Sequence, residues 1–113
     1  MTRRSVLWAR SARRDLEAIV TYLLDRSSQA AVSTLDRIEA RARSLATLGD
    51  RGRIVPELGR LHVQQFRELA VSPYRVVYRA RGASVLVLAV IDARRSLEDI
   101  LLDRLIRVEG QEG

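Results

Sequence analysis

The segment from Phe66 to Arg95 constrains the fold more than any other part of the chain, because it holds three strand-like patterns in succession. We expect strands at Phe66–Val71, Tyr74–Arg81 and Ser84–Asp92, with a break at Ser72-Pro73 and a tight turn at Gly82-Ala83. Connections this short join neighbouring antiparallel strands. The segment therefore predicts a three-stranded antiparallel meander.

The second and third strands of this meander differ in pattern. The second alternates, which places Tyr74, Val76, Tyr78 and Ala80 on one face and Arg75, Val77, Arg79 and Arg81 on the other. The third is an unbroken apolar run over residues 85–91, typical of a strand that is covered on both faces and lies inside a sheet. We therefore expect a sheet with one apolar face and one basic platform of accessible arginines.

Two amphipathic helical patterns precede the meander. After a short strand at Ser5–Ala9, a helix is expected from an N-cap at Ser11 to about Arg26, and a second from about Gln29 to Leu48, where Gly49 is expected to stop it. Their apolar stripes are Ala12, Leu16, Ile19 and Leu23, and Ala31, Leu35, Ile38, Ala42 and Leu45. Because the link between them is short, the helices should form an antiparallel hairpin on one face of the sheet.

The remaining segments are predicted to be a loop and a final helix. Residues 50–61 contain Gly52, Pro56 and Gly59 and are expected to be a loop, while Ser96 and Asp99 resemble a capping pair that opens a last helix. The order βααβββα predicts an α+β fold, with an antiparallel-rich sheet, an N-terminal helical hairpin on one face and a short C-terminal helix. We expect one domain over residues 1–113, ordered from about 5 to 107, with 108–113 as a tail.

The composition limits the function classes. The chain has 113 residues and no cysteine, which excludes a disulfide scaffold, a thiol nucleophile and a cysteine zinc site. Twenty basic residues, all of them arginine, face 14 acidic ones, and the net charge of +6 predicts an anionic partner, either nucleic acid or an acidic protein segment. No apolar run is long enough for a membrane span or a signal-peptide core, so we expect a cytoplasmic location and no membrane partner.

Four motifs occur in a fixed order: Gly52-Arg53-x-Val55-Pro56-Glu57-Leu58, Arg67-Glu68-Leu69, Pro73-Tyr74-Arg75-Val76-Val77-Tyr78, and an apolar strand that ends in Arg94-Arg95. Together they resemble the RelE/ParE superfamily of bacterial toxins, and most closely its ParE-like branch. The resemblance implies a toxin of a type II toxin–antitoxin system, with a role in growth regulation and stress response and without a metal or cofactor. It also implies a cognate antitoxin with an acidic or amphipathic C-terminal segment, and contact with operator DNA only through that antitoxin.

The two branches of this superfamily imply different activities. RelE-type members cut messenger RNA on the ribosome, which requires groups that accept and donate protons and cations around the phosphate. At the matching positions, Arg75 and Arg95 would serve as sheet arginines of such a site, with Arg67 possible, but Glu68 replaces an expected basic residue and Leu101 an expected tyrosine. Glu57, Glu68 and His62 can be argued as replacements. Glu68 is more simply explained by pairing with a neighbouring arginine, and His62 by an exposed or structural role.

ParE-type members poison DNA gyrase, and the missing proton-transfer groups favour this activity. The alternatives are a ribosome-dependent mRNA endonuclease, and an inactive homologue that binds an antitoxin or DNA. The residues expected to contact a target or antitoxin are Arg53, Glu57, Arg67, Arg75, Tyr78, Arg94 and Arg95. Tyr74 and Tyr78 are better explained as residues that pack in the core or the sheet than as base-stacking platforms.

Overall fold

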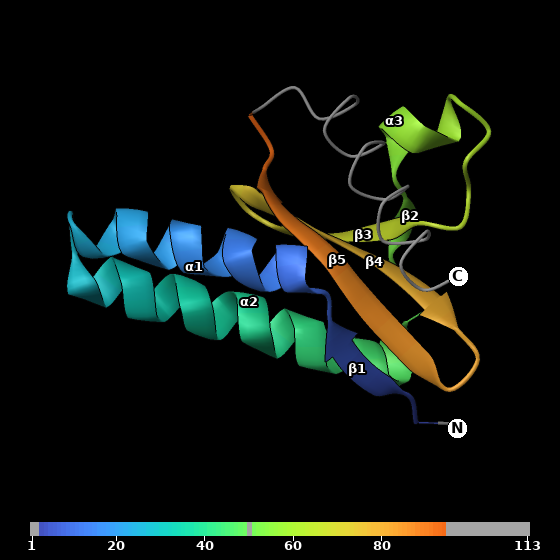
Figure 1. Ribbon diagram of the computed structural model, residues 1–113, viewed down its shortest axis with the longest axis horizontal. Helices are drawn as coiled ribbons and strands as arrows, with labels where there is room; N and C mark the ends of the chain where they lie inside the picture. Colours follow the sequence, from blue (N-terminus) through green and yellow to red (C-terminus); the bar gives the residue numbers. More distant parts are fainter. Residues whose placement is uncertain (1–2, 50, 95–113) are drawn as a thin grey trace.

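The computed structural model describes residues 3–49 and 51–94, in which a helical hairpin packs on one face of a five-stranded mixed sheet (Figure 1). The elements are β1 (Ser5–Trp8), α1 (Arg10–Leu24), α2 (Ser28–Leu48), β2 (Arg53–Ile54), α3 (Pro56–Gly59), β3 (Arg67–Val71), β4 (Tyr74–Arg81) and β5 (Ser84–Asp92). The strand order is β1-β5-β4-β3-β2. The expected α+β fold, its meander and its hairpin are confirmed. The predicted last helix at Ser96 and the tail at 108–113 lie outside the described residues.

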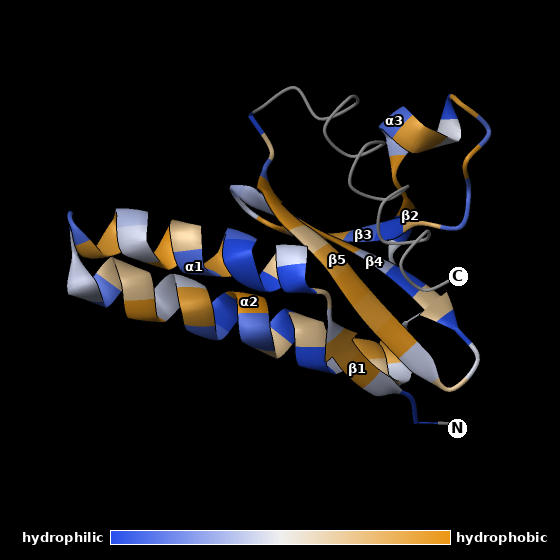
Figure 2. Ribbon diagram, viewed as in Figure 1, coloured by the Kyte–Doolittle hydropathy of each residue, from blue (hydrophilic) through white to orange (hydrophobic). Residues whose placement is uncertain are grey.

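The third strand of the meander, β5, lies inside the sheet as its apolar run predicts. It pairs in parallel with β1 and antiparallel with β4. Val77 lies opposite Ala89 while Tyr78 lies opposite Val87, so Leu88 is an extra residue on β5. This bulge places two consecutive side chains on the face away from the hairpin, and Figure 2 shows the continuous hydrophobic colour of the strand.

The hairpin and one face of the sheet enclose the larger core. The side chains of Ile38 and Leu45 are fully buried against Val76, Tyr78 and Val87, as part of a cluster to which Ala12, Ala42, Val71, Tyr74, Val85 and Val90 also belong. Leu16 and Ile19 are partly buried against this cluster. Leu23 and Leu35 are only half-buried. The joined ends of the helices extend past the edge of the sheet (Figure 1).

The first helix begins before the predicted position. Ala9 is the N-cap residue of α1 and provides no side-chain cap, so the expected cap at Ser11 is wrong. The Ser11 hydroxyl instead donates a hydrogen bond to the carbonyl of Leu88 at 3.0 Å, and the carboxylate of Asp15 accepts one from the amide of Val90 at 3.0 Å. Strand β1 pairs with β5 only up to Val87. Beyond that point, these side chains form hydrogen bonds with the backbone groups of β5 that β1 does not reach.

The connections at the other helix ends are close to the expected ones. The helix α1 ends at Leu24 rather than near Arg26, and α2 begins at Ser28 because the side chain of Ser27 accepts a hydrogen bond from the amide of Ala30. Gly49 ends α2 as expected, yet its φ of −60° is right-handed and not the left-handed conformation of a glycine stop. Space explains the glycine, since a Cβ atom there would lie 2.9 Å from Nη1 of Arg4.

The segment predicted to be a loop at residues 50–61 contains two short elements instead. The strand β2 pairs with β3, and α3 begins directly afterwards with Pro56 at its start. Val55 and Leu58 are fully buried and form a second core with Phe66, Val77 and Leu88 on the sheet face away from the hairpin. The apolar side chains of this segment therefore fold it onto the sheet. No helix in the described part of the chain is long and apolar enough to span a membrane.

Candidate functional site

A group of charged side chains lies on the sheet face that α3 covers, opposite the helical hairpin. Glu68 of β3 is directly opposite Arg53 of β2, and Arg75 of β4 is opposite Ala70, two residues further along β3. Residues two apart in a strand share a face, so the register places Arg53, Glu68 and Arg75 on one surface. Glu57 reaches the same group from α3.

These four residues form a continuous ion-pair network. Nη1 and Nη2 of Arg75 donate to the two carboxylate oxygens of Glu57, each at 2.7 Å, and its Nε donates to Glu68 at 2.8 Å. The other carboxylate oxygen of Glu68 accepts from Nε of Arg53 at 2.7 Å. All three nitrogen atoms of the Arg75 guanidinium are thus engaged by carboxylates, one of them in a bidentate pair.

Burial in the ion-pair network decreases from its centre outwards. The side chains of Glu68 and Arg75 are 3% and 11% exposed, that of Glu57 is 19% exposed, and that of Arg53 is 69% exposed. The hydrogen bonds from Arg75 lower the pKa of Glu57 from 4.5 to about 2, and the same bonds raise the pKa of Arg75. Glu57 and Arg75 therefore form a charged pair at neutral pH, and the network as a whole joins two arginines to two glutamates.

A second set of contacts fixes the chain just before β2. The Tyr78 hydroxyl donates to the carbonyl of Gly49 at 2.8 Å and accepts from the amide of Gly52 at 2.9 Å. Gly52 cannot carry a side chain, because a Cβ atom would lie 2.7 Å from the carbonyl oxygen of Glu68 and 2.9 Å from Cε1 of Tyr78. Arg67 donates from Nη1 to the carbonyl of Gly52 at 2.7 Å. These contacts fix the backbone between α2 and β2, directly before Arg53 of the ion-pair network.

The structure brings only some of the predicted site residues together. Arg53, Glu57 and Arg75 meet at Glu68, so the predicted pairing of Glu68 with a neighbouring arginine is confirmed. Arg67 lies beside them through its bond to Gly52. The set of predicted contact residues did not include Glu68, although its place opposite Arg53 in the register makes it the centre of the network.

Several other predicted placements differ. Arg94 lies at the end of β5, where its side chain is 78% exposed and pairs with Asp92 at 2.6 Å, and Arg95 lies outside the described residues. Tyr78 is fully buried, which does not agree with the expected contact to a partner. The expected platform of accessible arginines is wrong for Arg75 and Arg79, because the second core and the ion-pair network cover this face.

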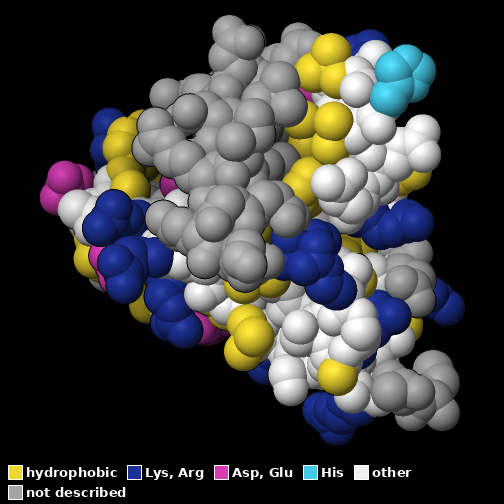
Figure 3. Space-filling model, turned by 45° about the vertical axis from the view of Figure 1, so that its right-hand side comes forward, with side chains coloured by type: hydrophobic (Ala, Val, Ile, Leu, Met, Phe, Trp, Pro, Cys, Tyr) yellow, Lys and Arg dark blue, Asp and Glu magenta, His cyan; other side chains and the backbone are white. Residues whose placement is uncertain are grey.

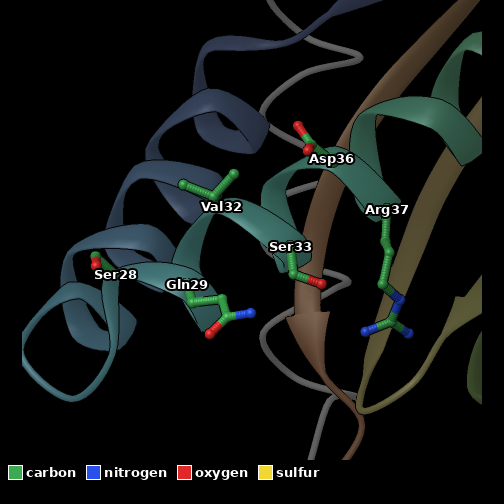
Figure 4. A pocket seen from close by; sticks show the side chains of 6 residues that line it. All are labelled: Ser28, Gln29, Val32, Ser33, Asp36 and Arg37. Carbon is green, nitrogen blue, oxygen red and sulfur yellow. The ribbon is translucent and has the colours of Figure 1, made fainter.

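A shallow hollow follows the outer surface of α2. It is lined by Ser28, Gln29, Val32, Ser33, Asp36 and Arg37, with Gln29, Ser33 and Arg37 projecting from the same side of the helix (Figure 4). The side chain of Arg37 reaches the turn between β3 and β4, where it donates a hydrogen bond to the carbonyl of Ser72 at 2.9 Å. Within residues 3–49 and 51–94, no group of three or more histidine, aspartate or glutamate side chains is placed to hold a metal ion.

The ion-pair network is suited to hold parts of the fold together and not to transfer protons. With a pKa of about 2, Glu57 is a weak base at neutral pH, and an arginine with a raised pKa is a weak acid. The network can instead hold α3 against β4 and keep the exposed side chain of Arg53 at the edge of the sheet. His62, which is exposed and has a left-handed φ of 63°, is not one of its members.

Comparison with known proteins identifies the family. The family model described as ParE toxin of type II toxin-antitoxin system, parDE, matches residues 6–97. The fold is similar to a structure of the chromosomal ParDE toxin–antitoxin system from P. aeruginosa, with a TM-score of 0.64, 23% identity, and coverage of 79% of this chain and 95% of that chain. It is also similar to a structure of the toxin–antitoxin complex RelBE2 from Mycobacterium tuberculosis, with a TM-score of 0.55, 19% identity, and coverage of 81% and 93%.

No curated protein sequence matches the chain. The family match nevertheless extends from β1 through β5, and so includes the hairpin, the whole sheet and every member of the ion-pair network. The chain belongs to the ParE toxin family and is a toxin of a type II toxin–antitoxin system within the ParE/RelE superfamily.

Proposed function

We propose that this toxin binds DNA gyrase and thereby stops replication, without a covalent step of its own. The observation that carries the proposal is the ion-pair network, in which Arg75 already has all three guanidinium nitrogens bonded to Glu57 and Glu68. The match to the ParE family supports the same target. On this proposal the toxin acts in the cytoplasm, where gyrase and the chromosome are located.

The ion-pair network counts against the alternative of mRNA cleavage. A metal-free ribonuclease needs a base, an acid and an unneutralised cation at the phosphate, and an acid or base typically contributes about 10²–10⁴-fold in rate. A phosphate that approached Arg75 would have to displace two carboxylates, one of them only 3% exposed. Glu57 is too weak a base to replace the missing group. Inhibition by binding requires no such group.

Purified components test the target directly. The toxin should inhibit supercoiling of relaxed plasmid DNA by gyrase, and it should leave ribosome-bound messenger RNA intact at the same concentration. Gln substitution of Glu57 serves as an informative variant, because it weakens the hold on Arg75 without removing a cation. The proposal is wrong if supercoiling is unaffected while messenger RNA is cut in the ribosomal A site.

We further propose that a cognate antitoxin neutralises the toxin by an acidic or amphipathic C-terminal segment. Arg53 and Arg94 are highly exposed cations, and Ile54 and Leu61 are exposed apolar side chains in the β2–α3 region. An acidic, amphipathic segment would find partners of both kinds there. The solved structures with this fold include complexes of toxins with antitoxins, which supports a partner of this class.

The salt dependence of association tests this partner. The protein encoded by the neighbouring reading frame should associate more slowly as salt rises, because attraction between exposed charges is screened. Arg53→Glu should slow association, whereas Arg26→Glu at the hairpin tip, with the same change in charge, should not. Equal association rates for both variants at low and high salt would rule out the electrostatic contribution of Arg53.

A further inference from the structure

Arginines from separate parts of the chain meet at one end of the molecule. The amide of Arg4 donates to the carbonyl of Ala46 at 2.8 Å, which joins the start of β1 to the last turn of α2. The amide of Ser5 donates to the carbonyl of Ala83 at 2.9 Å, which joins the same point to the β4–β5 turn, and the amide of Arg51 bonds to Leu48 at the end of α2. We call this surface the basic end; its arginines are Arg3, Arg4, Arg43, Arg51 and Arg81.

Positive charge is exposed at the basic end. The side chains of Arg3, Arg43 and Arg51 are exposed, and so are the hydroxyl-bearing residues Ser5 and Thr47. Figure 3 shows arginine side chains on the lower right of one face, and no acidic side chain is visible there among the described residues. By sequence, Asp50 precedes Arg51 and Glu39 lies one helical turn before Arg43, so five arginines against two acidic residues leave a formal net charge of +3.

We propose that the basic end binds the phosphate backbone of duplex DNA directly, without the antitoxin and without regard to sequence. Arginine forks together with serine and threonine hydroxyls are the groups that proteins use to contact DNA phosphates. The net charge of +6 and the isoelectric point of about 11.1 act in the same direction over longer distances. This inference does not depend on the target proposed above, and it departs from the expectation that operator DNA is contacted only through the antitoxin.

The distribution of apolar side chains favours DNA over an acidic protein segment at this surface. A protein partner needs apolar anchors at the centre of its contact. The most exposed large apolar side chains include Tyr22, Leu24 and Val32, which lie at the joined ends of the hairpin and so at the opposite end of α2. Leu7 of β1, two residues after Ser5, is exposed, but one apolar side chain does not make the apolar centre of a protein contact. Single-stranded nucleic acid is also a poorer fit, because its recognition relies on exposed aromatic side chains.

The number of exposed arginines sets the expected salt dependence. If Arg3, Arg43 and Arg51 each contact one phosphate, the slope of log K against log salt concentration should be about −2.7. Affinity should then fall roughly 40-fold between 50 and 200 mM salt. A few contacts of this kind give weak, sequence-independent binding with a dissociation constant of about 10⁻⁴–10⁻⁶ M. Such binding would be enough to concentrate the toxin on the chromosome.

Fluorescence anisotropy with a labelled duplex of random sequence tests the proposal on the full chain without antitoxin. Arg51→Glu and Arg43→Glu should each weaken binding by roughly fivefold or more and lower the salt slope by about 1. The matched control is Arg26→Glu at the hairpin tip, since every one of these variants changes the net charge from +6 to +4. The control should bind within about twofold of the parent protein. Arg51→Gln provides a milder second variant, and circular dichroism checks the fold.

Three results would overturn the proposal. The first is that the duplex fails to bind at 50 mM salt. The second is that the three charge-reversal variants lose the same affinity, which would show that only the net charge of the protein matters. Alternatively, polyglutamate displaces the duplex as well as unlabelled DNA does at equal charge concentration, which would identify the basic end as a site for acidic protein segments. Preferential competition by DNA, together with loss in the Arg43 and Arg51 variants alone, supports direct DNA binding.

Discussion

Among single residues, Arg75 has a different role in the fold from the one that its sequence pattern suggests. An arginine on a strand face resembles a phosphate ligand, and its position after the Pro73-Tyr74 pair matches the superfamily pattern. In the folded protein the same guanidinium joins α3 to β3 through Glu57 and Glu68. Its first role is therefore to stabilise the second face of the sheet, and the exposed cation of the network is Arg53.

This difference in burial predicts different costs of removing the two arginines. Arg75→Ala should destabilise the protein by roughly 3–5 kcal/mol, because it leaves Glu57 and the buried Glu68 without their main partner. Arg53→Ala should cost no more than about 1 kcal/mol, since that side chain is mostly in solvent. Urea unfolding at pH 7 measures both. Equal losses of stability would contradict the assignment of Arg75 as the more buried arginine of the network.

The lowered pKa of Glu57 predicts that the free energy of unfolding decreases at acid pH. The folded-state pKa of about 2 lies below the ordinary value of 4.5, so the stabilisation is fully present above about pH 4.5 and is lost as the pH falls towards 2. The difference corresponds to roughly 3 kcal/mol at neutral pH. Glu57→Gln should therefore be less stable than the parent at pH 7, and the two should converge near pH 2. If the difference in unfolding free energy between the two proteins is the same at pH 7 and near pH 2, the charge of the carboxylate contributes nothing.

Residue patterns in the sequence predicted parts of this site and missed the rest for a physical reason. The register of adjacent strands follows from the meander, so the pairing of Glu68 with an arginine could be predicted. The contact of Glu57 with Arg75 spans 18 residues and depends on how the segment after β2 folds back, which no local pattern specifies. A core position for Tyr78 was predicted from its place on the apolar face of the strand and is confirmed by its burial, although a tyrosine there also suits a binding surface.

Among the elements, the helices and the meander were predictable because their periodicities are long and regular. The bulge at Leu88 was not predictable, although it explains why β5 serves two cores without alternation. The start of α1 was misplaced because the hydroxyl of Ser11 bonds to the edge of β5 and not to its own helix. The segment with β2 and α3 was missed because its two elements are only two and four residues long.

The packing of α2 predicts different costs for truncating two of its apolar side chains. Ile38 is fully buried in the core between the hairpin and the sheet, so Ile38→Ala should cost roughly 2–5 kcal/mol. Leu35 is only half-buried, so Leu35→Ala should cost clearly less. Thermal and urea unfolding of the two variants provide the comparison. A Leu35→Ala protein less stable than Ile38→Ala would show that the hairpin packs differently.

At the scale of the whole molecule, the sheet is covered on both faces. The hairpin covers one face, while α3 and the second core cover the other. Exposed cations lie at β2, at the end of β5 and at the basic end, and also along both helices, as at Arg10, Arg14 and Arg41. On the function proposed above, this surface charge suits large anionic or acidic partners, and the bonds of Arg75 to two carboxylates count against cleavage of a phosphodiester bond.

Pulse labelling after induction of the toxin without its antitoxin is the most direct test of gyrase inhibition. We expect thymidine incorporation to fall before methionine incorporation, with filamentous cells and DNA damage signalling, because a bound gyrase stops replication first. Induction of an Arg75→Ala variant separates toxicity that requires the intact fold from effects of overexpression. If methionine incorporation collapses first and ribosome-bound transcripts are cut, the toxin is an endonuclease and the ion-pair network must open to expose Arg75.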